Sequence, residues 1–287
     1  MTSQSTQTGT AFAPELQEAI KQEAATERRT RVRDTTLAVL TPIVLLAAWE
    51  ISARTGAIDG RIFTPPSAIV QRALEMLADG SLLHHTWATI KRLLMGFLSG
   101  AAAGIIVGLI MGVIRPVRAA LGPTFTALYA LPKIAILPLL LLIFGLTETP
   151  KILSVAISVF FVLQINTLAG IMQIDQRILE AAKAYQATGL NLFRHVLLPG
   201  ALPTIFTGIR VAAGQSVIVV TSVEFVASND GLGYLIWNSW QLFQPSTMYV
   251  GLVVVSIVGA LMTFFAIKVE QISMPWKYTS RKKGTKK

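Results

Sequence analysis

Long runs of apolar residues constrain this chain more than any other feature of its sequence. A helix needs about 20 mostly apolar residues to cross the hydrocarbon core of a bilayer. Six segments have that length with few charges: residues 35–53, 93–114, 119–147, 152–174, 201–226 and 247–267. The sequence therefore predicts an all-α, polytopic membrane protein with six transmembrane helices.

The composition agrees with membrane embedding. Of the 287 residues, 53% are hydrophobic and 14% are charged, whereas about a quarter of the residues of a soluble domain are charged. The chain contains no cysteine, which excludes disulfides and thiolate metal sites. No metal site is expected from the three histidines, because His84 and His85 are predicted on the opposite side of the bilayer from His195.

Basic residues collect on one side of the predicted spans. The net charge is +10, and lysine and arginine are enriched in segments that face the cytoplasm. Most of them fall on one side if both termini are cytoplasmic. This predicts a cytoplasmic tail over 1–34, a transmembrane domain over 35–275 and a basic tail over 276–287. Because topology accounts for the charge and basic residues are not interleaved with aromatic ones, no nucleic-acid partner is expected.

Glycines recur every four residues in the second predicted span. They line one slowly turning helix face, where another backbone can approach closely. Tight packing against a helix is the favoured interpretation, and a substrate path along the groove is the alternative. The glycines are Gly96, Gly100, Gly104, Gly108 and Gly112.

The charged segment 175–200 lies between two apolar spans, on the predicted cytoplasmic side. Asp175 can cap a helix, and Gly189 can end that helix in a left-handed conformation. Asn191 can cap a second helix, which Pro199 would stop. The pattern predicts two short helices joined by a tight bend. Two interpretations follow: a lever docked into a groove of another protein, or an amphipathic loop resting on the lipid surface.

Helical spacing divides the first of these short helices into two faces. Leu179, Ala182 and Tyr185 share one face and are expected to pack against the protein. The opposite face, which is left free to meet a partner, carries Glu180, Lys183 and Gln186.

Residues 180–199 resemble the cytoplasmic EAA loop of ABC importer permeases. That pattern has E-A-A, a glycine four residues after the second alanine, and L-P at its end. Glu180, Ala181, Ala182, Leu198 and Pro199 fall on it. Gln186 stands at the glycine position, so the bend is expected at Gly189 instead, nearly one helical turn later.

The resemblance extends over roughly residues 35–275. The segments IFTPPSAIV, ALPKIAILPLLLLIFGLTETPKI and GLGYLI are similar to permeases of the nitrate, aliphatic sulfonate, taurine and bicarbonate importers. The resemblance implies a type I ABC importer permease with six spans, in the bacterial inner membrane. It also implies a small anionic solute as substrate and no catalysis by this chain.

The same resemblance implies a set of partners. Two cytoplasmic ATPase subunits would bind ATP and Mg, so no cofactor is expected in this chain. An external solute-binding protein would deliver the substrate. A second permease subunit would complete the path, either a copy of this chain, which is favoured, or a related chain. The ATPase-coupling residues would be Glu180, Ala181, Ala182, Lys183, Tyr185, Gln186, Gly189 and Pro199.

Ionisable and polar groups within spans are candidates for function. Lys133 lies between Pro132 and Pro138, both of which are expected to disturb the third helix. It is predicted either to attract an anion in the translocation path or to snorkel to an interface. Gln215 and Ser216, at mid-depth on the fifth span, could face a substrate or bond to a neighbouring helix.

Arg92 and Glu224 are both expected near the outer side of the membrane. The sequence predicts that they pair across two helices and form part of an outer gate. Arg210 is too far from Glu224 along the helix to pair with it and is expected to make a structural contact nearer the cytoplasm. A stand-alone channel or secondary transporter is the alternative function, and it would require paired buried carboxylates or an inverted repeat.

Overall fold

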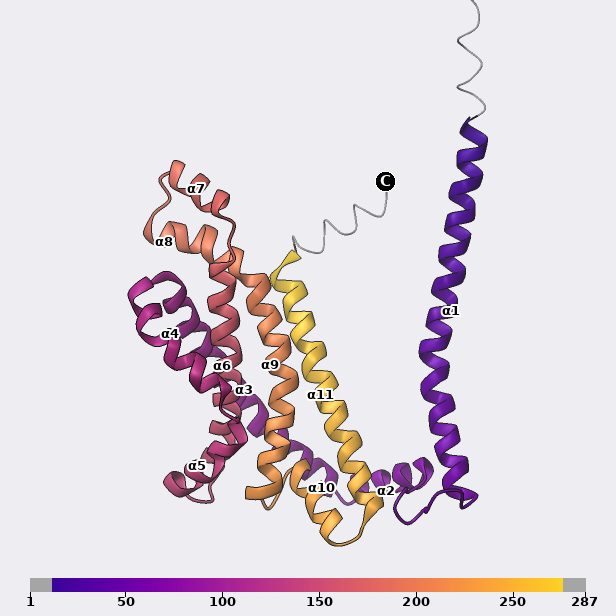
Figure 1. The fold of residues 1–287 in the computed structure, drawn as a ribbon. Coiled ribbons are helices and arrows are strands. Elements are labelled where there is room, and N and C mark those ends of the chain that lie inside the picture. Colours follow the sequence, from indigo (N-terminus) through magenta and orange to yellow (C-terminus); the bar gives the residue numbers. More distant parts are fainter. Residues whose placement is uncertain (1–11, 276–287) are drawn as a thin grey trace, which may run out of the picture. The chain divides into compact units, whose positions relative to one another are not determined.

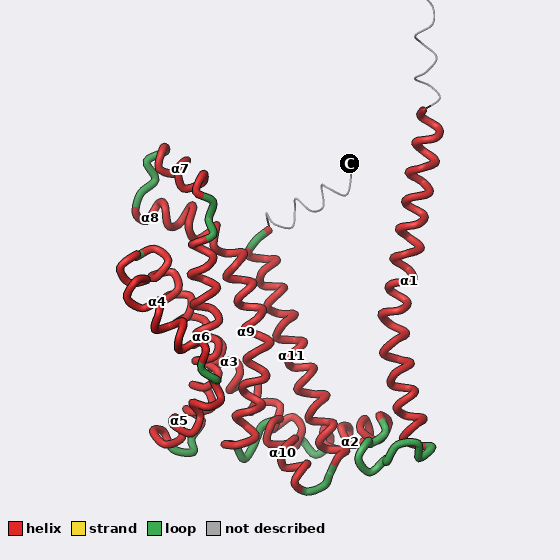
Figure 2. The backbone as a smooth tube through the Cα atoms, in the orientation of Figure 1, coloured by secondary structure: helices red, strands yellow, loops and turns green. Residues whose placement is uncertain are grey.

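The computed structural model describes residues 12–275, and every regular element in that range is a helix (Figure 2). The chain divides into two compact units, residues 1–68 and 69–287. The predicted basic tail over 276–287 lies outside the described residues, as do residues 1–11 of the predicted N-terminal tail.

The first unit contains a single long helix, α1 (Phe12–Arg54). The predicted first span falls within its apolar part, Val32–Arg54. The carboxylate of Glu50 accepts hydrogen bonds from the backbone N–H and the hydroxyl of Ser67, at 3.0 and 2.7 Å. Ser67 lies in the first turn of α2 (Pro66–Ala78), where backbone N–H groups have no partner within the helix. Glu50 therefore ties the end of α1 to the start of α2.

The second unit is a helical bundle built around three long helices, α3, α6 and α9, with α11 beside α9 (Figure 1). Short helices join them at both ends. In chain order the elements are α3 (Ser81–Val113), α4 (Arg115–Ala130), the 3-10 helix η1 (Lys133–Ile136), α5 (Leu137–Phe144), α6 (Glu148–Met172), α7 (Gln176–Ala184), α8 (Gly189–Leu192), the π-helix η2 (Phe193–Leu197), α9 (Leu198–Ala227), α10 (Leu232–Gln241) and α11 (Pro245–Ser273).

Five helices of the described chain are long and apolar enough to cross a membrane, and a bent pair makes a sixth span if it counts as one. The pair joins α4 to η1 and α5 with a bend of 95°, and we call residues 115–144 the elbow. Leu131 is extended there, at φ −67° and ψ 137°, because the following Pro132 disfavours helical geometry. The expected disturbance at Pro138 is wrong, since this proline lies in the first turn of α5, where no N–H is needed.

The predicted start of the second span at residue 93 is too late. Helix α3 begins at Ser81 and includes Lys91 and Arg92, which lie outside the predicted span because charges are costly within one. The side chain of Arg92 is only 2% exposed and is paired with carboxylates of other helices. Those carboxylates offset the cost of its burial.

The glycine face of α3 packs against α6 of the same chain. A Cβ atom on Gly96 would lie 2.6 Å from Cβ of Val155, and one on Gly108 would lie 2.6 Å from Cβ of Thr167. Tight helix packing is thus confirmed as the use of these glycines. The alternative of a substrate path along the glycine groove is wrong, because α6 fills it.

Candidate functional site

The predicted functional residues gather at the two ends of helix α6. The helix has 25 residues, which corresponds to about 37 Å at 1.5 Å per residue. Glu148 begins it, beside a cluster of charged side chains, and the segment 175–200 follows its other end. Figure 1 shows α10 and the pair α7 and α8 at opposite ends of the bundle. We call residues 175–200 the coupling loop.

The coupling loop begins with a capped helix. The side chain of Asp175 accepts a hydrogen bond from the backbone N–H of Arg177 at 2.8 Å, so the predicted N-cap of α7 is confirmed. Helix α7 packs back against the π-helix η2, and Ala182 is the residue of α7 that is buried.

The bend of the loop is at Gln186 and not, as predicted, shifted to Gly189. Gln186 has a φ of +56°. Its N–H bonds to the carbonyl of Lys183 at 2.9 Å, and the N–H of Ala187 bonds to the carbonyl of Ala182 at 2.9 Å. These two bonds are the helix-ending pattern in which the left-handed residue is usually glycine. Gln186 therefore stands at the glycine position of the EAA pattern and adopts a backbone conformation that favours glycine.

The second half of the loop also differs from the prediction. Thr188, not Asn191, is the N-cap of α8, and Gly189, with a φ of +52°, is its first residue. Pro199 does not end a helix, because Leu198 before it is helical and both lie in the first turn of α9. The N–H of Leu198 bonds to Phe193 five residues back, in a π-type bond, and Pro199 has no N–H that needs a partner.

Apolar side chains are exposed on the loop. Tyr185 is 88% exposed and Leu190 is 76% exposed. The expectation that Tyr185 shares a buried face with Ala182 is wrong, since the chain turns away at Tyr185, where α7 ends. Glu180, Lys183 and Gln186 are exposed, as predicted for a face that is free to meet a partner.

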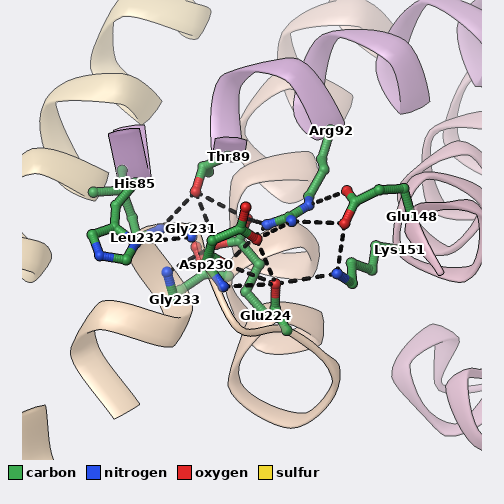
Figure 3. Close-up of polar contacts among 12 residues, drawn as sticks. His85, Thr89, Arg92, Glu148, Lys151, Glu224, Asp230, Gly231, Leu232 and Gly233 are labelled. Carbon is green, nitrogen blue, oxygen red and sulfur yellow. Dashed lines mark hydrogen bonds and ion pairs between the residues drawn. The ribbon is translucent and has the colours of Figure 1, made fainter. Parts of the chain in front are cut away.

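At the other end of α6, the predicted contact between Arg92 and Glu224 is present. Nη1 of Arg92 lies 2.8 Å from Oε1 of Glu224. The side chain of Arg92 is 2% exposed and that of Glu224 is fully buried. Figure 3 shows them reaching toward each other from α3 and α9.

Arg92 is the hub of a larger cluster. It donates to both carboxylate oxygens of Glu148, at 2.6 and 2.9 Å. It also donates to the carbonyl oxygen of Asp230 at 3.0 Å and pairs with the carboxylate of Asp230. Lys151, one turn after Glu148, lies 2.7 Å from it. We call Arg92, Glu148, Lys151, Glu224 and Asp230 the charge cluster.

The charge cluster also holds the start of helix α10. The hydroxyl of Thr89 donates to Glu224 at 2.9 Å and accepts from the N–H of Leu232 at 2.7 Å. The N–H of Gly233 donates to Glu224 at 2.8 Å. The first N–H groups of a helix have no partner within it, so side chains of α3 and α9 supply the acceptors for α10.

The pair of Arg92 and Glu224 is the one contact of this cluster that could be predicted from the sequence. Glu148 and Lys151 lie three residues apart, directly before the apolar run of the fourth span. That spacing on one helix face was the available signal, but both residues fall between the predicted third and fourth spans. Asp230 lies between α9 and α10. Burial alone would raise the pKa of Asp230, but the hydrogen bond and charge of Arg92 outweigh it and hold that pKa below its ordinary value.

The other predicted residues do not join either group. Lys133 is half-buried, and its Nζ donates to the carbonyl oxygen of Tyr129 and lies 4.2 Å from the centroid of the Tyr129 ring. Gln215 is exposed on α9, whereas Ser216 is buried and donates to the carbonyl of Ala213 on its own helix at 2.8 Å. None of these contacts links Lys133 to Gln215 or Ser216.

Arg210 makes the structural contact that was predicted for it. Its Nε lies 3.3 Å from Oε2 of Glu270, a fully buried carboxylate on α11. The sequence analysis missed Glu270, because it ended the sixth span at residue 267, before the helix ends at Ser273.

Comparisons with known proteins agree with this arrangement. The chain is 35% identical over 235 residues to the "Putative aliphatic sulfonates transport permease protein SsuC" of Escherichia coli (strain K12), and the match covers 82% of this chain and 89% of that protein. It is 28% identical over 249 residues to the taurine transport system permease protein TauC of the same organism, covering 85% and 90%. A chain of the MetNI methionine ABC transporter in an inward-facing conformation shares the fold, with a TM-score of 0.58, 20% identity, and coverage of 68% of this chain and 97% of that one.

The family model described as "Binding-protein-dependent transport system inner membrane component" matches residues 100–271, which is more than half of the chain. The helices α6 and α9, the coupling loop and the C-terminal part of α3 from Gly100 onward fall within that match. The chain therefore belongs to this family of inner-membrane ABC importer permeases, which are transport subunits and not enzymes.

Proposed function

We propose that this permease forms the path for a small anionic sulfonate, of the aliphatic sulfonate or taurine type. The support is the likeness to two permeases whose names carry those substrates. Membership of the importer family supports this function over a stand-alone secondary transporter or channel.

The coupling loop is proposed as the docking site for a cytoplasmic ATPase subunit, which would bind ATP and Mg. The observation that carries this is the exposure of Tyr185 and Leu190, at 88% and 76%, on a loop whose backbone is held by a cap and by helix-ending hydrogen bonds. A large apolar residue held rigidly in water is typical of an interface. Closure of an ATPase pair would then move the loop together with α6 and α9.

The proposed orientation follows from the coupling loop. With that loop in the cytoplasm, both termini are cytoplasmic and the charge cluster is at the outer end. A second copy of this chain and two ATPase subunits would complete the importer, and an external solute-binding protein would deliver substrate at the outer end. We assign the buried pair Arg92 and Glu224 to an outer gate that closes the translocation path. Lys133 and Gln215 are assigned to the translocation path itself.

Copurification with the ATPase tests the docking site. We expect Tyr185→Ser with Leu190→Ser to weaken ATPase binding roughly thirtyfold, because loss of an interface hot spot costs about 2 kcal/mol. Deletion of residues 180–190 should abolish copurification. The thermal unfolding temperature of the serine variant should match that of the wild type, since both side chains are exposed.

A matched control is available at the other end of the bundle. Leu242 and Phe243, in the turn before α11, are 57% and 92% exposed. Leu242→Ser with Phe243→Ser removes a similar exposed apolar area and should leave ATPase copurification unchanged. Undiminished ATPase binding by the coupling-loop variant would contradict the proposed docking site.

A further inference from the structure

A cavity of about 500 Å³, open to the surroundings, lies between α3, α6 and the elbow. Its lining is apolar apart from Ser99, and it includes Ala103 of α3, Leu128 and Ile136 of the elbow, and Ile157 and Phe160 of α6. Small-molecule sites of proteins commonly have volumes of about 300–1,000 Å³ and mostly apolar walls. The size and lining suit a small apolar group.

The elbow also carries a positive charge, at Lys133. Lys133 stands between Leu128 and Ile136 in the chain, and both of these line the cavity. Its contacts within the described residues are the carbonyl oxygen and ring of Tyr129, and no carboxylate is among them. An ammonium group within a membrane span is costly without a counter-ion. An anion next to the cavity would supply one.

We propose that the cavity holds the alkyl chain of an aliphatic sulfonate while Lys133 pairs with the sulfonate group. This inference rests on the proposed sulfonate permease function. It is carried by the match in chemistry: an apolar chain for the apolar walls and a fixed negative charge for the unpaired lysine. The ammonium group of taurine, by contrast, would lie among apolar walls, where the hydroxyl of Ser99 is the polar side chain of the lining. Burying a charge without partners is costly. The site therefore favours alkyl over amino-substituted sulfonates.

Photolabelling of the intact complex with its ATPase subunits tests this. The probe is an octanesulfonate that carries a diazirine at the far end of its chain. We expect labelled residues on α3 and α6 around Ala103 and Ile157. Butanesulfonate should compete with the probe, and taurine should compete about tenfold less well, as expected for burial of a poorly paired charge.

Three variants sharpen the test. Lys133→Met should reduce labelling about tenfold, as expected for loss of a charge-assisted hydrogen bond, and Lys133→Arg should restore most of it. Ala103→Phe should fill the cavity and abolish labelling by the long probe. Lys91→Met, which removes an exposed lysine from α3, is the matched control and should label like the wild type.

The alternative occupants give distinct results. One such result is that added phospholipid reduces labelling in the cavity while butanesulfonate does not. That result would show that a lipid chain occupies the cavity, and it would overturn the proposal. Label that crosslinks two permease copies through the elbow would show a subunit interface and also overturn it. If the wild-type complex imports sulfonates while Lys133→Met and Ala103→Phe leave their uptake unchanged, the cavity assignment alone fails. If the wild type imports neither alkanesulfonates nor taurine, the proposed function fails with it.

Discussion

The two ends of helix α6 place their polar and apolar side chains in opposite surroundings. At the end with Glu148, Arg92 and Glu224 are buried, and carboxylates of α6, α9 and the α9–α10 turn surround the Arg92 side chain. At the end with the coupling loop, charged residues such as Glu180 and Lys183 are exposed, and so are the apolar side chains of Tyr185 and Leu190.

This difference indicates different roles for the two ends. The charge cluster satisfies its own hydrogen bonds from within the chain, so it can hold α3, α6, α9 and α10 together without a partner. The coupling loop fixes its backbone with its own hydrogen bonds but leaves its apolar side chains uncovered. The first end is suited to rigidity within one chain, and the second carries the exposed apolar side chains that the proposed ATPase docking site requires.

Removal of the hub should have the largest effect on stability. Arg92→Met leaves buried Glu224 without its counter-ion, and breaking a buried pair in this way costs about 3–5 kcal/mol. We expect little folded protein, measured by size-exclusion chromatography and thermal unfolding in detergent. Arg115→Met, an exposed arginine near the coupling-loop end, should change stability by less than about 0.5 kcal/mol.

Because Arg92 contacts several carboxylates, exchanging Arg92 and Glu224 tests whether the two residues act as an isolated pair. If Arg92 and Glu224 formed an isolated pair, exchanging the two residues would restore folding. In the structure Arg92 also contacts Glu148 and Asp230, so a glutamate at position 92 would face two carboxylates. We expect the swapped protein to remain unfolded, and full rescue would show that the pair acts alone.

Two glycines with positive φ angles, one at each end of α6, allow a direct comparison of the two ends. Gly231, at φ +103°, lies against the carboxylate of Glu224, whereas Gly189, at φ +52°, has no atom within 4 Å of the place where a Cβ would be. Gly189→Ala should cost about 1–2 kcal/mol, the strain of the left-handed backbone. Gly231→Ala should cost more, about 3 kcal/mol, because the methyl group also displaces a buried charge. Equal unfolding temperatures for the two variants would break the comparison.

The smallest effect is expected from pH. The pKa of Asp230 is held below its ordinary value by Arg92, so its contribution to stability is present above the pKa of the unfolded chain, about 3.9. It is lost as pH falls through the lower pKa of the folded protein. The side chain is 36% exposed, so water weakens the effect. The difference in unfolding temperature between wild type and Asp230→Asn should shrink below about pH 4, and a constant difference would exclude this linkage.

The sequence by itself determined the helical membrane class, the approximate spans and the position of the coupling loop. These depend on local properties, namely apolar length, the Asp175 cap and the EAA spacing, which are written in consecutive residues. Even the contact of Arg92 with Glu224 could be predicted, because opposite charges expected near the same membrane face of two spans tend to pair.

Only the tertiary structure decided which further groups meet at Arg92 and which face of the loop is exposed. Glu148, Lys151 and Asp230 are adjacent to Arg92 because the ends of α3, α6 and α9 meet at one point, and no local pattern records that meeting. Gln186 adopts a left-handed backbone although glutamine does not favour it, since the hydrogen bonds of Gln186 and Ala187 to the end of α7 hold it there. Backbone hydrogen bonds outweigh the low propensity of glutamine for this conformation, so propensity alone predicts the wrong position for the bend.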